Sequence, residues 1–183
     1  MLIRTVFILS CFFVFGCKSP EARKPVQSNS GTFIKNSVER NKKLYEQEKA
    51  AIQSIIDKDS TRNYITSENG FWYYYNSKDS IVTNKPVFGD EVTFTYNIED
   101  FNGKEILSEE ETGLQFYKVE QTNQDLISGI REGIKLMQEG EQVTFLFPSY
   151  KAYGYYGIQG KLGSNVPVKS TITLKSINQT EEN

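Results

Sequence analysis

The residues best suited to chemistry lie in one stretch, residues 145–157, with the sequence FLFPSYKAYGYYG. An alternating apolar segment ends at Pro148, which has no N–H to donate and is poorly placed in a central strand. A loop with tyrosines at positions 150, 153, 155 and 156 follows. Because surface loops are usually polar, a loop this aromatic either covers the core or forms one wall of a pocket. A pocket of this kind would bind through ring faces and hydroxyl groups.

The residue types that are missing exclude several classes of enzyme. The chain has 183 residues, a formal net charge of −2 and no histidine. Without histidine, the commonest general base and the commonest transition-metal ligand are absent, so His-dependent triads and most zinc sites are excluded. Cys11 and Cys17 are the two cysteines, so the rest of the chain has no thiol nucleophile and no disulfide. The balanced charge argues against nucleic-acid binding.

The tyrosine-rich stretch resembles a motif of a known family. Pro148-Ser149-Tyr150-x-Ala152-Tyr153-Gly154 is similar to the Pro-x-x-x-Ala-Tyr-Gly segment of the FKBP-type peptidyl-prolyl cis-trans isomerases. The resemblance extends over roughly residues 64–178. With its N-terminal half included, the chain most resembles the gliding-motility-associated isomerase lipoproteins of Bacteroidetes. The resemblance implies an enzyme that binds an Xaa-Pro segment in an apolar cup between helix and sheet, with no cofactor and no metal.

The resemblance also implies roles for individual residues. Tyr153 would donate its hydroxyl to one substrate carbonyl, the backbone N–H of Ile127 would bond a second, and Tyr96 matches the family's tyrosine on the second strand. The implied substrate-binding residues are Ile106, Leu107, Phe116, Leu126, Ile130, Val166 and Leu174. Each apolar residue taken alone also fits an ordinary core. Their joint order along the chain is what favours a pocket.

Rotation about an Xaa-Pro bond needs no proton transfer and no covalent intermediate. Its barrier of about 18–20 kcal/mol comes from amide resonance, and an apolar cup shaped to the less polar twisted amide lowers that barrier. The chain departs from the family at Ile130, where Trp is usual, and at Leu107, where Asp is frequent. Its loop at 155–165 is also longer and richer in glycine than that of the shortest members of the family. We therefore expect modest catalysis and weak binding of macrolides such as rapamycin. A chaperone or assembly module with little turnover, and a purely structural lipoprotein, are the alternatives.

The first 17 residues have the composition of a lipoprotein signal. Residues 1–4 form a short positive segment that contains Arg4, and residues 5–16 are almost wholly apolar. This apolar stretch is too short for a membrane span but typical of a signal peptide. Val14-Phe15-Gly16-Cys17 resembles a lipobox. We expect a signal peptide over 1–16, lipidation of Cys17, and a lipoprotein anchored to a membrane of the cell envelope, facing the periplasm or the surface. An ordinary signal peptide that ends near a cysteine is the alternative.

Two segments separate this signal from the domain. Residues 17–35 are poor in apolar side chains, which predicts a flexible linker. Residues 36–60 have helical periodicity, and Asn36 with Glu39 could form a capping box at its start. The apolar stripe of this helix consists of Val38, Tyr45, Ile52 and Ile56, flanked by Leu44, Ala51 and Ile55. The stripe predicts packing either on the domain or on a second copy in a dimer.

Residues 64–178 contain six strand-like segments and one helical segment. The clearest strand is 92–98, and Asn102-Gly103 is a strong hairpin signal. Residues 125–139 have helical periodicity, and Gly129 and Gly133 in it indicate a close approach to another element. We predict an α+β fold: an FKBP-like curved antiparallel β-sheet wrapped around one short helix, preceded by the N-terminal helix and followed by a polar tail at 179–183.

Overall fold

The computed structural model describes residues 30–78, 84–121 and 126–179. The predicted signal peptide, Cys17, most of the predicted linker and residues 180–183 of the predicted tail lie outside the described residues. Residues 1–39 and 40–183 form two units, and each is described by itself. Within the described residues, no helix combines the length and apolar character needed to cross a membrane.

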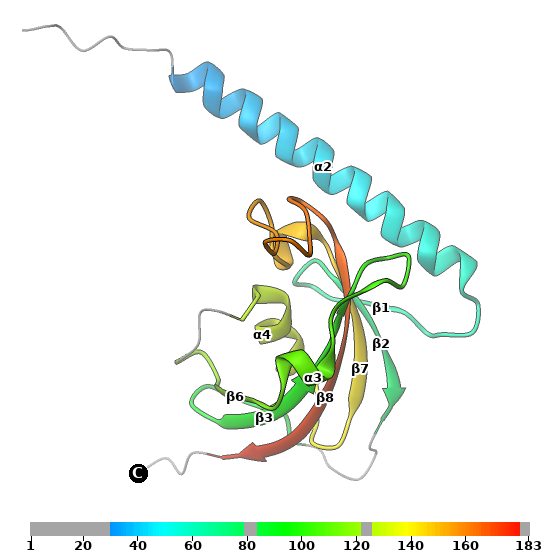
Figure 1. The fold of residues 1–183 in the computed structure, drawn as a ribbon, viewed down its shortest axis with the longest axis vertical. Coiled ribbons are helices and arrows are strands. Elements are labelled where there is room, and N and C mark those ends of the chain that lie inside the picture. Colours follow the sequence, from blue (N-terminus) through cyan, green and yellow to red (C-terminus); the bar gives the residue numbers. More distant parts are fainter. Residues whose placement is uncertain (1–29, 79–83, 122–125, 180–183) are drawn as a thin grey trace, which may run out of the picture. The chain divides into compact units, whose positions relative to one another are not determined.

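Among its described residues, the second unit forms one antiparallel sheet of eight strands (Figure 1). The strands are β1 (Ile65–Thr66), β2 (Trp72–Ser77), β3 (Glu91–Tyr96), β4 (Ile98–Glu99), β5 (Glu105–Leu107), β6 (Gln115–Lys118), β7 (Gln142–Phe147) and β8 (Val168–Asn178). Their hydrogen-bonded order is β1-β2-β7-β8-β3-β6, and β4 pairs with β5 and β8. Register shifts in β2 and β3 add local twist, and the sheet curves around the short helix α4 (Ser128–Ile134).

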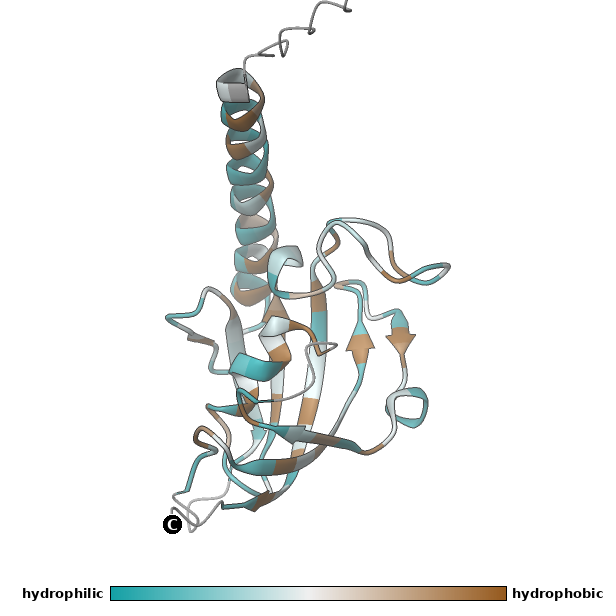
Figure 2. Ribbon diagram, turned by 90° about the vertical axis from the view of Figure 1, so that its left-hand side faces the viewer, coloured by the Kyte–Doolittle hydropathy of each residue, from teal (hydrophilic) through white to brown (hydrophobic). Residues whose placement is uncertain are grey.

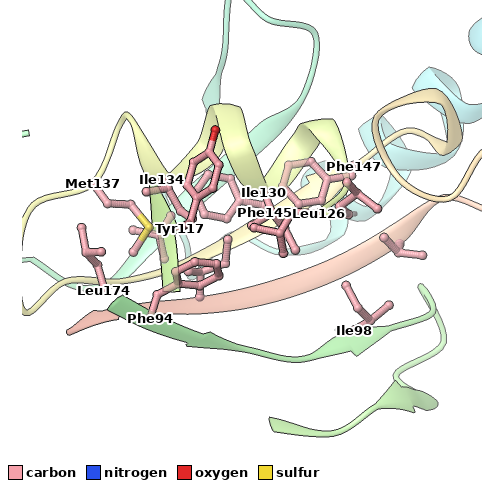
Figure 3. Close-up of a cluster of buried hydrophobic side chains, with 14 of the residues drawn as sticks. Phe94, Ile98, Tyr117, Leu126, Ile130, Ile134, Met137, Phe145, Phe147 and Leu174 are labelled. Atoms are coloured by element: carbon pink, nitrogen blue, oxygen red, sulfur yellow. The ribbon is translucent and has the colours of Figure 1, made fainter. Parts of the chain in front are cut away.

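The core lies between α4 and the face of the sheet that this helix covers (Figure 3). β8 shows why the strands form there: every second residue from Val168 to Leu174 is buried, and the residues between them are more exposed. This period of two places one apolar face on the core. Rings of Phe71, Phe145 and Phe147 meet at centroid separations of 5.4–5.8 Å. The predicted α+β fold is confirmed.

Two glycines let α4 lie directly on β7. A Cβ atom at Gly129 would be 2.6 Å from Cδ1 of Phe147 and 2.9 Å from the carbonyl oxygen of Lys151. A Cβ atom at Gly133 would be 2.9 Å from Cε1 of Phe145. The close approach predicted from these glycines is therefore present. The helix is shorter than the predicted 125–139. After Ile134 the chain continues with hydrogen bonds between residues three apart, from the Leu136 N–H to the Gly133 carbonyl and from the Met137 N–H to the Ile134 carbonyl, which are not α-helical.

Substituting Gly129 by alanine is expected to lower the free energy of unfolding by about 2 kcal/mol. The added methyl group has no room, because a ring and a backbone carbonyl face it. Gly163→Ala is the matched control, since its Cβ would meet only Val166, at an ordinary 3.7 Å. Urea denaturation checks both variants. Equal stability of Gly129→Ala and the parent would contradict the close packing of α4.

The helix preceding the domain, α2 (Ser30–Lys58), begins six residues earlier than the predicted 36. Residues 30–35, predicted as linker, are therefore helical. No proline follows Pro25 before the helix, so nothing stops it from extending upstream. Asn36 lies inside the helix instead of capping it, at a cost of only about 0.5 kcal/mol relative to alanine. In this first unit, Phe33, Ile34 and Val38 are exposed.

Within residues 40–183, α2 packs on the sheet face opposite the main core. Ile52 of the helix is fully buried against Trp72 and Leu146, which are register partners on β2 and β7. Ile55 and Ile56 pack on the same cluster. Figure 2 shows apolar segments recurring along a largely polar helix. The C-terminal half of the predicted stripe is therefore covered by the chain's own domain.

Candidate active site

The sheet contributes Tyr96, at the end of β3, and the β4–β5 hairpin. Gly103 has φ 83° in the tight turn between these strands, as the Asn102-Gly103 signal predicted. The hairpin pairs Leu107 with Ile98, which brings β5 close to Tyr96. Ile106 is 7% exposed, and Leu107 and Tyr96 are half-buried against the core.

The loop after β7 carries Tyr153. β7 ends at Phe147, and the 3₁₀ helix η2 (Ser149–Lys151) follows Pro148. The Ser149 carbonyl accepts bonds from the N–H groups of Ala152 (3.0 Å) and Gly154 (2.9 Å). Gly154 has φ 52°, a left-handed conformation that glycine adopts readily. These bonds fix Tyr153, whose hydroxyl shares a hydrogen bond with that of Tyr96.

The start of α4 lies beside this loop. The Ser128 hydroxyl donates to the Lys151 carbonyl at 3.4 Å. Ile127 precedes the helix in an extended conformation, and its carbonyl accepts the N–H of Arg131. Among the described residues, no acceptor takes the N–H of Ile127. The N–H of Ile127, which sequence analysis assigned to a substrate carbonyl, is therefore available to a ligand.

The loop at 155–167 lies on the other side of Tyr153. The Asn165 N–H donates to the Gly154 carbonyl at 2.7 Å, which holds half-buried Val166 near Tyr153. Ile158 and Leu162 form a bridge that keeps the loop folded back. We call the set Tyr96, Ile106, Leu107, Ile127, Tyr153 and Val166 the Tyr153 site. Leu126 is buried beside it, immediately before Ile127.

Phe116, predicted as an aromatic wall of the pocket, lies on the outer face of β6, away from the core. It is 63% exposed, whereas its neighbour Tyr117 is 2% exposed and points into the core. Side chains alternate across a strand, so an error of one position moves a residue to the other face. Gln115 shares the inner face with Tyr117, and its side-chain amide donates to the Thr112 carbonyl.

Ile130 and Leu174 also differ from their predicted contact role. Both have 0% exposure, so neither can touch a peptide in this conformation. Figure 3 shows Leu174 beside Met137 and Phe94, and Ile130 farther along the same core. Both residues pack in the hydrophobic core and stabilise the fold. Ile130, in place of the family's usual Trp, therefore affects how the core packs and not the surface that a peptide would touch.

The electrostatics of the site keep its hydroxyls neutral. Burial raises the pKa of Tyr153, and the neighbouring Tyr96 raises it further. Burial also raises the pKa of Tyr96, while its hydrogen bond with Tyr153 opposes that shift. Within the described residues, no three His, Cys, Asp or Glu side chains gather as a metal site would require. The site thus offers phenol hydroxyls, one N–H and apolar surface.

These groups suit rotation about an amide. Groups that donate to the carbonyls of a bound peptide would fix it on both sides of a proline, and apolar surface beside them favours the less polar twisted amide. No group needs to gain or lose a proton. We therefore expect turnover to be constant between about pH 6 and pH 9, where the site has no titrating side chain.

Stability should depend on pH in the alkaline range. Because the pKa of Tyr153 is raised in the folded state, the unfolded chain loses this proton first. The free energy of unfolding is then fully retained below about pH 10 and falls as pH rises beyond it. Urea denaturation at neutral and alkaline pH checks this, and Tyr153→Phe should make the fall shallower. An unchanged slope in that variant would show that other tyrosines cause it.

Comparisons with known proteins agree with this geometry. The family model described as FKBP-type peptidyl-prolyl cis-trans isomerase matches residues 82–175. A peptidyl-prolyl cis-trans isomerase from Pseudomonas syringae has a similar structure, with TM-score 0.59, 19% identity, and coverage of 75% of this chain and 96% of that one. FkpA from Escherichia coli has TM-score 0.58 and 18% identity, covering 96% of this chain and 82% of its own. No curated protein sequence matches at a significant level. The matched region spans half of the chain and contains the whole Tyr153 site, and on this evidence the chain belongs to the family of FKBP-type peptidyl-prolyl cis-trans isomerases.

Proposed function

We propose that this isomerase acts on Xaa-Pro bonds of cell-envelope proteins and assists their folding while tethered to a membrane. The observation that carries the proposal is the pairing of the Tyr153 site with a lipobox-like segment that ends at Cys17. Uncatalysed isomerisation takes tens of seconds or more, so a tethered catalyst would accelerate the folding of proline-containing proteins that arrive in the envelope.

Exchange NMR on a short Ala-Xaa-Pro peptide, with and without the full chain, tests the activity. Tyr153→Phe removes a donor to the substrate and should lower kcat/KM about tenfold. Tyr156→Phe is the matched control, because this tyrosine is 91% exposed and lies outside the Tyr153 site. Equal activity of the two variants would remove Tyr153 from the mechanism.

The second candidate is a chaperone or assembly module with little turnover. Leu107, in place of the family's frequent Asp, favours it because a polar contact in the site is lost. Suppression of aggregation of a denatured client, without catalysed exchange of the peptide, would support this candidate. Catalysed exchange that Tyr153→Phe reduces would exclude it.

Membrane attachment is tested separately. Labelled palmitate should be incorporated by the parent chain and not by Cys17→Ser, which should also leave the membrane fraction. Two or more acyl chains would anchor the protein stably, whereas one would not. A label that persists in Cys17→Ser would exclude the proposed anchor. A role in gliding motility is proposed on family resemblance alone, and loss of gliding in a deletion strain tests it.

A dimer through residues 36–60 is a further proposal about partners. Val38 is exposed, which supports it, whereas Ile52 already packs on its own domain. Sedimentation equilibrium of the parent and of Val38→Glu distinguishes the two: a dimer that dissociates in the variant supports the proposal. A monomeric parent would exclude it.

A further inference from the structure

A groove with a volume of about 1070 Å³ lies between α2 and the loop that follows β7. Its lining includes Arg40, Lys43, Tyr45 and Glu48 from the helix, and Tyr150 and Asn165 from the loops. No residue of the Tyr153 site lines it. Gly154, the residue next to Tyr153, does. The groove and the Tyr153 site therefore adjoin the same short segment of the loop.

The groove contains a buried carboxylate with unused capacity. Glu48 is 5% exposed, and its Oε2 accepts the N–H of Ser149 at 2.8 Å. Its Oε1 is buried and has no hydrogen-bond partner among the described residues. Buried polar atoms are nearly always paired, so an oxygen left without a donor indicates that a ligand with a hydrogen-bond donor is expected here.

The rim of the groove has the opposite charge. Arg40 and Lys43 are exposed, and within the described part of the chain neither forms an ion pair. Tyr45 and Tyr150 meet edge to face at 5.7 Å, and Tyr155 is 75% exposed. The groove thus combines free cations and ring faces outside with one hydrogen-bond acceptor inside.

We propose that this groove binds an acidic, extended segment of the polypeptide whose proline occupies the Tyr153 site. Main-chain N–H groups of such a segment suit the acceptor on Glu48, and its carboxylates suit Arg40 and Lys43. The phosphate groups of a nucleic acid carry no hydrogen-bond donor for Glu48, whereas a polypeptide backbone carries an N–H at every residue except proline, so a polypeptide fits better than a nucleic acid. The proposal deepens the proposed function and rests on it, because it names the class of client that the isomerase prefers.

Fluorescence anisotropy with the full chain and a labelled, proline-free peptide of Asp, Glu and Gly tests binding without the Tyr153 site. The double variant Arg40→Glu/Lys43→Glu should raise Kd about tenfold. Lys42→Glu/Lys49→Glu is the matched control, since both lysines are exposed on the same helix and do not line the groove. It should raise Kd about twofold or less.

Equal weakening by the two double variants would overturn the proposal, because only the general charge of the surface would then matter. Absence of binding to the parent would also overturn it. Retained binding without isomerisation of the short peptide would contradict the proposed function and leave the groove intact. In exchange NMR, an acidic extension on the Ala-Xaa-Pro peptide should lower KM severalfold in the parent and not in Arg40→Glu/Lys43→Glu. The same KM for extended and short peptides would show that the two sites do not share a client.

Discussion

Replacing Glu48 by alanine is expected to lower the free energy of unfolding by about 2 kcal/mol and kcat/KM about tenfold. The Glu48 carboxylate accepts the N–H of Ser149 at 2.8 Å, and both residues are buried. Ser149 begins η2, and its carbonyl in turn holds the backbone on either side of Tyr153. Loss of the carboxylate leaves a buried N–H without an acceptor and loosens the loop that positions the Tyr153 hydroxyl.

Thermal denaturation and exchange NMR on the short peptide measure the two effects. Glu46→Ala is the matched control, because Glu46 is exposed on the same helix. Glu48→Gln keeps an acceptor for Ser149 and should retain most of the stability. If Glu46→Ala is as damaging as Glu48→Ala, the effect belongs to the helix in general and not to the bond with Ser149.

Replacing Phe147 by alanine is expected to cost about 4 kcal/mol of unfolding free energy. The ring is fully buried, lies 5.4 Å from the rings of both Phe71 and Phe145, and would contact a Cβ at Gly129. Truncation therefore leaves a cavity where α4, β2 and β7 meet. Urea denaturation measures the loss, and the slope of the transition shows whether the fold has loosened.

Phe116→Ala is the informative comparison. The ring is 63% exposed, so its removal should change the unfolding free energy by less than about 1 kcal/mol and leave peptide turnover unchanged. A loss of activity in Phe116→Ala would restore the sequence-based assignment of this residue to the substrate wall.

The fold could be predicted because its strands have regular alternation and its turns have clear signals. β3 and β8 each place every second side chain on the core. The hairpin at Asn102-Gly103 has a local cause, the positive φ angle of Gly103. The glycines of α4 indicate a close approach because they lack the side chain that would prevent it. Both features can be inferred from the residue types at these positions, and for this reason they could be predicted from the sequence.

The remaining features depend on contacts or register that the sequence does not display. The segment around β6 has apolar residues of both parities, Leu114 and Phe116 on one side and Tyr117 and Val119 on the other, so its inner face was ambiguous. The depth of Ile130 and Leu174 depends on how closely α4 approaches the sheet. The bond between Glu48 and Ser149 joins residues 101 positions apart, and no local pattern indicates it.

The position of β2 in the sheet has a practical consequence for work on this protein. The family match begins at residue 82, downstream of β2, which pairs with β7 along its length. A chain trimmed to the matched range would leave β7 as an open edge with unpaired main-chain groups, and it would uncover Leu146 by removing Trp72 and α2. Bare apolar edges recruit strands from other molecules, so such a fragment is expected to self-associate rather than remain soluble.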